Sequence, residues 1–283
     1  MINNNKIYKI MANTNLVALK GYFDNDAVKK NLQAMLGQKA QGFATSVLSV
    51  VNNNKLLQNA EPASIYSSAM VAASLDLPIN PNLGFAALVP YGRVCQFQIM
   101  TRGLVQLAIR SGVYAKITNC DVHEGELIKA DPFTDEYIFD ASKRTSDKVI
   151  GYMAYMKTTS GFEKYYYMSK EDALAHGKKY SKSFATGVWN SDPDAMGRKS
   201  CLKLLLSKFG ILSIELQRAI KFDQGIVKGD FSQMESIQDI DAVEVDYVDN
   251  PQNGVDEKKA ADVAKKFEDF DSAEEVKDGK EGK

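Results

Sequence analysis

The composition of the chain changes near residue 229, and this change limits how much of the sequence can build a packed core. Residues 230–283 contain 17 acidic and 7 basic side chains and few aromatic ones. Because the whole chain has 35 basic and 36 acidic residues, residues 1–229 keep 28 basic and 19 acidic side chains, a net charge of +9. Segments of low hydrophobicity and high net charge bury too little apolar surface to fold. We therefore expect a basic folded body, of the kind that binds polyanions, followed by an acidic flexible tail.

Three regions are predicted along the chain. Residues 1–15 are rich in asparagine and lack periodicity, which indicates a disordered N-terminus. Residues 16–222 carry helical and strand patterns and are expected to form the folded core. Residues 223–283 form the predicted acidic tail, in which apolar side chains share one face of a short amphipathic helix at about 257–270. A helix of this length is only marginally stable alone in water.

The order of the patterns predicts an α+β fold with a helical N-terminal region. Apolar residues recur at helical spacing over 24–53, and Gly37 and Gly42 predict a break into two helices. The segment Pro90-Tyr91-Gly92-Arg93 lies between two strand-like runs and predicts a β-hairpin. Helices packed on a mostly antiparallel meander of hairpins follow from this order. Further helices are expected over 62–75, 103–110, 170–176, 193–209 and 213–222, and strands over 85–89, 94–99, 113–122, 136–140, 149–157 and 162–168.

Cations and aromatic rings alternate between residues 164 and 221. This stretch has eleven basic and only five acidic side chains, with tyrosine, phenylalanine and tryptophan between them. Lysine and arginine neutralise phosphates, and flat rings stack bases without distinguishing them, so the pattern is typical of a single-strand binder. The three successive tyrosines Tyr165–Tyr167 are better explained as core and sheet surface.

The predicted helix over 193–209 has two kinds of basic residue. Lys199 and Lys203 are one turn apart on the same side, so both can reach one nucleic-acid backbone. Arg198 lies on the apolar stripe of the helix. Two interpretations stay open: it pairs with Asp194 one turn earlier, or its stem crosses apolar surface and places the guanidinium in a cleft.

Period-two alternation gives the second strand of the predicted hairpin two unlike faces. One face is apolar and should be core: Cys95, Phe97 and Ile99. The other face is polar, and with the flanking arginines it would form a cationic ledge, although an ordinary exposed sheet face is the alternative. The residues of this ledge are Arg93, Gln96, Gln98 and Arg102.

The usual signatures of catalysis and of metal binding are missing from the sequence. We find no phosphate-binding loop, no paired cysteines, and only two histidines, His123 and His176. The acidic pairs Glu124/Glu126 and Asp192/Asp194 fall at a turn and at a helix start, where capping is their expected role. A metal-dependent nuclease that uses these pairs, and a protein-interaction module that docks through the tail, remain the alternatives.

The N-terminal residues resemble no signal peptide, and no apolar run is long enough to span a membrane. The three cysteines are odd in number and far apart, which favours a reducing, cytoplasmic setting without disulfides.

Four ordered blocks of the sequence resemble the RecT family of phage single-strand annealing recombinases. The first, SAMVAASLDLPINPNLGFAALVPYGRVCQFQIMTRGLVQLAIRSGVY, covers residues 68–114 and contains the family's "VPY" hairpin and glutamine strand. The others are EGEL at 124–127, VIGYMAYM at 149–156 and DPDAMGRKSCLKLLLSKFGILSIELQRAI at 192–220. The likeness spans about residues 16–220.

The resemblance implies a protein that binds single-stranded and annealed duplex DNA without ATP and catalyses no covalent step. It also implies rings or helical filaments of identical chains and a companion 5′→3′ exonuclease, with a host single-strand-binding protein as a further candidate partner. No cofactor is expected, and Mg²⁺ would serve at most as a counterion of the DNA. The residues that would line the DNA groove are Arg93, Gln96, Gln98, Arg102, Arg198, Lys199 and Lys203, with Lys178, Lys179 and Lys182 in the loop region before them.

Overall fold

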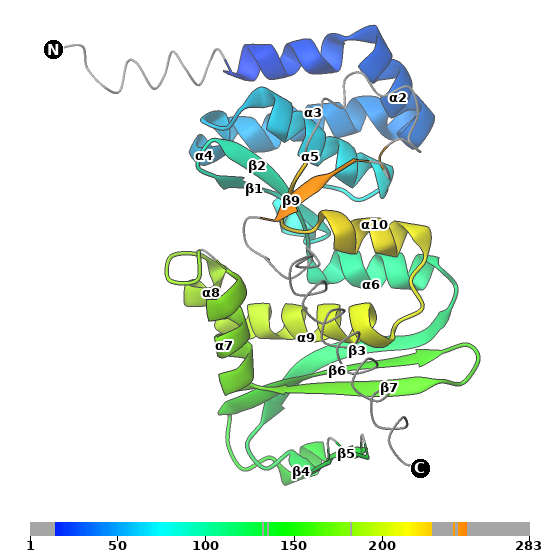
Figure 1. The fold of residues 1–283 in the computed structure, drawn as a ribbon, viewed down its shortest axis with the longest axis vertical. Coiled ribbons are helices and arrows are strands. Elements are labelled where there is room, and N and C mark those ends of the chain that lie inside the picture. The colour runs from blue at the N-terminus through cyan, green and yellow to red at the C-terminus, as the bar shows by residue number, and fades with distance from the viewer. Residues whose placement is uncertain are drawn as a thin grey trace, which may run out of the picture.

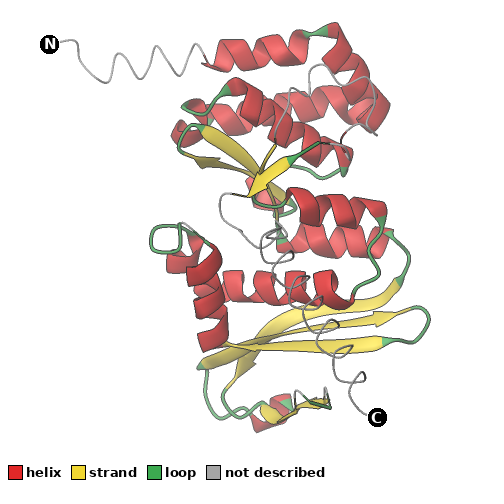
Figure 2. Ribbon diagram, viewed as in Figure 1, coloured by secondary structure: helices red, strands yellow, loops and turns green. Residues whose placement is uncertain are grey.

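The chain folds into antiparallel strand pairs that are covered by helices (Figures 1 and 2). The computed structural model describes residues 15–131, 133–134, 136–181, 183–227, 240 and 243–247. Helices dominate the N-terminal end and a three-stranded sheet lies at the opposite end, which confirms the predicted α+β class. Within the described ranges, none of the helices combines the length and the apolarity that a bilayer crossing requires.

The N-terminal helices surround one buried helix. Asn25 accepts hydrogen bonds from two backbone amides and so begins the first full helix, and Gly37, at φ 53°, ends it where the sequence predicts a break. In α5 every residue from Ile65 to Ala73 is buried, because α2 packs on one side and the β1–β2 hairpin on another. After the helical residues 15–24, the helices are α2 (Asp26–Leu36), α3 (Ala40–Asn52), α4 (Lys55–Gln58) and α5 (Pro62–Ser74).

The β1–β2 hairpin joins this helical end to the rest of the chain. Its two strands are β1 (Ala86–Tyr91) and β2 (Val94–Ile99), in the register Tyr91↔Val94 and Ala86↔Ile99. Helix α6 (Thr101–Arg110) follows at once, and a side chain at Gly103 would lie 2.1 Å from the carbonyl oxygen of Phe85. Helix α6 can therefore pack on the hairpin only with glycine at this position.

The second sheet has the strand order β3–β6–β7. Helix α9 covers one face, where a Cβ at Gly197 would lie 2.2 Å from the ring of Tyr152. The rings of Tyr165 and Tyr167 lie against the β4–β5 hairpin, in contact with Tyr137 and Phe139. The strands are β3 (Tyr114–His123), β6 (Val149–Thr158), β7 (Glu163–Ser169), β4 (Leu127–Asp131) and β5 (Glu136–Phe139).

Helices α7 to α10 complete the fold. Ser169 caps the first of them, because its hydroxyl accepts a hydrogen bond from the amide of Asp172. Helices α6 and α10 contact each other, and both lie between the hairpin and the second sheet in Figure 1. The helices are α7 (Lys170–Tyr180), α8 (Val188–Ser191), α9 (Pro193–Phe209) and α10 (Ile214–Phe222).

Several elements lie outside the predicted set. Strand β8 (Gly225–Val227) pairs with β9 (Val245–Tyr247), and β8 contacts β2, although the sequence predicts a flexible tail from residue 223. Strand β4 and helix α8 are not predicted either, and α7 is four residues longer than expected. The amphipathic helix expected at about 257–270 lies outside the described residues, and the predicted region boundaries at 15/16 and 222/223 stay predictions.

Candidate nucleic-acid interface

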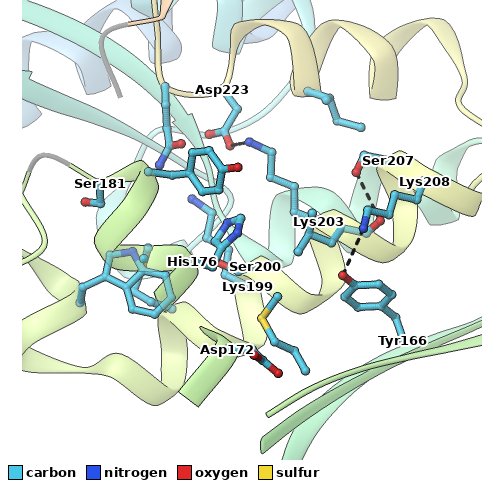
Figure 3. Close-up of a pocket in the computed structure, with 18 residues that line it drawn as sticks. Tyr166, Asp172, His176, Ser181, Lys199, Ser200, Lys203, Ser207, Lys208 and Asp223 are labelled. Carbon is cyan, nitrogen blue, oxygen red and sulfur yellow. Dashed lines mark hydrogen bonds and ion pairs between the residues drawn. The ribbon is translucent and has the colours of Figure 1, made fainter. Parts of the chain in front are cut away.

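A cavity of about 490 Å³ opens between helix α7, helix α9 and the end of helix α10 (Figure 3). Three lysines of α9 line it, Lys199, Lys203 and Lys208, and two carboxylates, Asp172 and Asp223. Figure 3 places Lys199 and Lys203 near the middle, with Asp223 at one side and Lys208 at the other. The lining also contains His176 and three aromatic residues, Tyr166, Tyr180 and Trp189.

Asp223 is the buried carboxylate of the cavity, with 1% of its side chain exposed. One oxygen lies 2.5 Å from Nζ of Lys203, and the other accepts a hydrogen bond of 3.0 Å from the backbone amide of Ile99 in β2. Burial alone would raise its pKa, but the charges of Lys203 and Lys199 and these hydrogen bonds hold the pKa below its usual value. Asp223 is therefore ionised at neutral pH.

Lys199 is buried in the cavity wall, where no described residue pairs with it alone. Its exposed fraction is 5%, and among the described residues no hydrogen bond or close ion pair engages its Nζ. Burial lowers the pKa of Lys199, an effect that the charge of Asp223 opposes and that of Lys203 adds to. Two lysines thus lie beside one carboxylate, and the cavity as a whole is lined by three lysines and two carboxylates.

The other end of the cavity combines a third cation with neutral rings. Nζ of Lys208 donates a hydrogen bond of 3.3 Å to the hydroxyl of Tyr166. The ring of His176 lies 4.7 Å from that of Tyr180. Burial lowers the pKa of His176, and the charges of Lys203, Lys179 and Lys208 lower it further, so the imidazole is neutral at pH 7. Flat neutral rings beside ammonium groups suit a nucleotide, which has both a base to stack and a phosphate to neutralise.

The prediction that Lys199 and Lys203 share one side of the helix is confirmed, because both line the same cavity. Arg198, the third α9 residue of the predicted groove, does not line it. Its guanidinium lies 2.5 Å from Asp121 of β3, so the pairing with Asp194 is wrong. Asp194 instead accepts hydrogen bonds from Tyr152 and contacts Lys170 at 2.9 Å.

The polar ledge predicted on the hairpin is wrong for Gln96. Its side chain is fully buried, and neither amide atom has a hydrogen-bond partner among the described residues. The alternation correctly assigns Cys95, Phe97 and Ile99 to the core. It fails for Gln96 because the hairpin is covered on both faces, by α5 and by the β8 and α10 region.

The remaining predicted residues that the structure describes do not line the cavity. Arg93 is exposed at the hairpin turn, 3.8 Å from Glu61, and Gln98 donates to the hydroxyl of Tyr91. Arg102 donates to the carbonyl oxygen of Leu83 and lies over the ring of Phe85. The other three are Lys178 and Lys179, exposed in the last turn of α7, and Lys182, which lies outside the described residues.

Asp223 and His176 are the cavity residues that the sequence did not single out. Both are single polar residues near the ends of amphipathic helices, where solvent exposure is the ordinary expectation. The place of Asp223 depends on the contact of α10 with β2, and that of His176 on the contact of α7 with α9, and local periodicity reveals neither contact. Among the described residues, no group of three acidic, histidine or cysteine side chains has metal-binding geometry.

Comparisons with known proteins agree on one family. The model of the RecT family matches residues 41–242. The chain is 48% identical over 202 residues to "Uncharacterized protein YqaK" of Bacillus subtilis (strain 168), covering 71% of this chain and 70% of that protein. It is 24% identical over 214 residues to "Protein RecT" of Escherichia coli (strain K12), covering 72% of this chain and 79% of that protein. The matches cover more than two thirds of the sequence, and the chain therefore belongs to the RecT family.

Proposed function

We propose that this chain anneals complementary DNA strands without ATP and holds the first strand against the α9 cavity. Membership of the RecT family implies a single-strand annealing recombinase, a class that binds single-stranded DNA and is not enzymatic. The observation that carries the site is the excess of lysines in the cavity lining, where Lys199, Lys203 and Lys208 outnumber two carboxylates. A phosphate is the group that would neutralise this excess.

The chemistry of the cavity suits a backbone-inward arrangement of the strand. Lys203 and Lys208 bind phosphates, which releases counterions and supplies most of the affinity. Tyr180 stacks on a neighbouring base or sugar and helps to hold the strand extended. Because these contacts are independent of base identity, the Watson–Crick edges stay available to a complementary strand.

The remaining predicted residues are proposed to extend the path of the strand on either side of the cavity. Exposure supports this role for Arg93, Lys178 and Lys179, whose cationic groups reach the surface. Gln98, Arg102 and Lys182 are proposed on the family resemblance. Arg198 is proposed to stabilise the fold by pairing with Asp121 rather than to contact DNA, and Gln96 is left out because it is buried.

We also propose that the chains assemble into rings or filaments on DNA and act in the cytoplasm with a 5′→3′ exonuclease. The family resemblance is the basis for the assembly and for the exonuclease. The three free cysteines, two of them buried, support a reducing compartment.

The acidic pairs that would serve a metal-dependent nuclease hold structural positions instead. Asp192 accepts a hydrogen bond from the amide of Ala195 and caps α9. Glu126 accepts one from the amide of His123, and Glu124 one from the hydroxyl of Ser146. These bonds support the annealing function over the nuclease.

The test measures binding of the full-length chain to a fluorescent oligothymidylate at increasing salt, and then annealing of complementary oligonucleotides without ATP. The wild type should show a log–log salt slope of several units. Lys203→Gln should weaken binding about tenfold and reduce the slope by about one, because one phosphate contact is lost. The matched control is Lys39→Gln, an exposed lysine that contacts Asp76 outside the cavity and should change neither value. A wild-type chain that binds no single strand, or binds it equally at all salt concentrations, contradicts the proposal.

A further inference from the structure

Asp223 occupies the position beside Lys203 that a bound anion would take. Its carboxylate oxygen lies 2.5 Å from Nζ of Lys203, the separation of a charge-assisted hydrogen bond. A phosphate oxygen forms the same kind of bond with an ammonium group. The lysine therefore already has an anionic partner within the protein.

The two partners differ in how far they can move. Asp223 is fixed, because its second oxygen accepts from the amide of Ile99 and its own amide donates to the carbonyl of Ala219. Lys203 has a flexible four-carbon stem and 19% of its side chain exposed, on the cavity side of α9. When a competing anion enters the cavity, Lys203 is the partner that can turn toward it.

Lys199 determines what happens to the carboxylate that Lys203 leaves behind. Its buried amine has no hydrogen-bond partner among the described residues, and its charge acts on Asp223. A buried carboxylate without a counter-ion is strongly destabilising. Lys199 can supply that counter-ion, so the exchange need not leave Asp223 uncompensated.

We propose that Asp223 is an internal substitute for a DNA phosphate: Lys203 exchanges Asp223 for the incoming phosphate, while Lys199 stays behind as the counter-ion of Asp223. This proposal rests on the proposed function and divides the labour between the two lysines. Lys203 contacts DNA and Lys199 is a positioning residue. The exchange also makes binding weaker than an unpaired Lys203 would give, since each phosphate must displace a carboxylate.

The test replaces Asp223 with the isosteric amide. Asp223→Asn keeps an acceptor for the amide of Ile99 and removes the charge that competes with phosphate. The affinity for a fluorescent oligothymidylate should rise about tenfold, the value of one charged hydrogen bond. The log–log salt slope should stay unchanged, because Lys203 contacts one phosphate in the wild type and in the variant. A merely structural role of Asp223 would leave the affinity unchanged or lower it.

Two further variants separate this effect from misfolding and from general charge. Asp223→Asn combined with Lys199→Met removes both members of the buried pair and should bind as tightly as the single variant, even where the single variant folds poorly. Asp76→Asn is the matched control, because Asp76 also contacts two cations, Lys39 and Arg110, away from the cavity. It should change neither affinity nor slope.

The outcomes distinguish this inference from the proposed function. If the wild type binds the oligonucleotide but both Asp223 variants bind it with unchanged affinity, or more weakly, the exchange does not occur. If Asp76→Asn gives the same gain as Asp223→Asn, the gain reflects net charge and the exchange is again rejected. A wild type that binds no oligonucleotide overturns the proposed function itself.

Discussion

The two sides of helix α9 hold basic residues in opposite electrostatic situations. On the sheet side, Arg198 lies 2.5 Å from Asp121, and nearby Lys170 lies 2.9 Å from Asp194, so each cation has its own carboxylate. On the cavity side, Lys199 and Lys203 share Asp223. Balanced pairs hold a fold together, whereas an excess of one sign is available to a ligand. The pairing of a basic residue, rather than its position along the helix, thus indicates its role.

The largest difference between the two sides of α9 should be in stability, and removing the side chain of Arg198 tests it. Arg198→Met leaves Asp121 without its cation, and the other oxygen of Asp121 is already buried without a partner among the described residues. The pair is about one third exposed, so the free energy of unfolding should fall by about 2 kcal/mol, less than for a fully buried pair. Chemical denaturation measures this loss, and single-strand affinity of the folded variant should stay unchanged.

A surface pair supplies the control for this substitution. Arg144 lies 2.7 Å from Asp147, whose side chain is 99% exposed. Arg144→Met should therefore cost about 0.5 kcal/mol or less. Equal losses for the two variants, or a loss of DNA affinity for Arg198→Met alone, would show that the sheet side is not purely structural.

Acid should weaken the balanced side through Asp194. Hydrogen bonds from Tyr152 and Lys170 and the nearby charges lower the pKa of Asp194 below its usual value, against the effect of its partial burial. A carboxyl group with a lowered folded pKa stabilises the fold above its unfolded pKa of about 3.9, and this contribution is lost as pH falls through the folded pKa. Asp194→Asn should therefore reduce the dependence of stability on pH below about pH 4. Denaturation midpoints at pH 7 and pH 3 give the comparison, and an unchanged difference between them would argue against the contribution.

The sequence predicted which basic residues share a side of α9, but it did not predict the distant carboxylates that pair with them. Helical spacing placed Lys199 and Lys203 on one side, because residues one turn apart are neighbours in any helix. The partner of Arg198 is Asp121, 77 residues earlier, and the partner of Lys203 is Asp223, which reaches it only because α10 folds back onto β2. The prediction that Gln96 is exposed was wrong for the same reason. Alternation describes a strand with one buried face, and both faces of β2 are buried. The family resemblance indicated the function without these contacts.

The smallest effect is expected for the rate at which a thiol reagent labels the cysteines. Bound DNA should leave this rate unchanged on the sheet that α9 covers. Cys120 is exposed on β3 next to Asp121, whereas Cys95 and Cys201 are buried, and burial raises the pKa of each buried thiol to about 12. A thiol reagent at pH 8 should therefore label Cys120 first and the other two only on unfolding, since the thiolate is the reactive form. A saturating oligothymidylate should leave the rate at Cys120 unaltered, with Cys120→Ser as the control for the site of labelling. Strong protection of Cys120 by DNA would place the strand, or a neighbouring chain assembled on it, against the sheet that α9 covers and would argue against a strand that is confined to the cavity side.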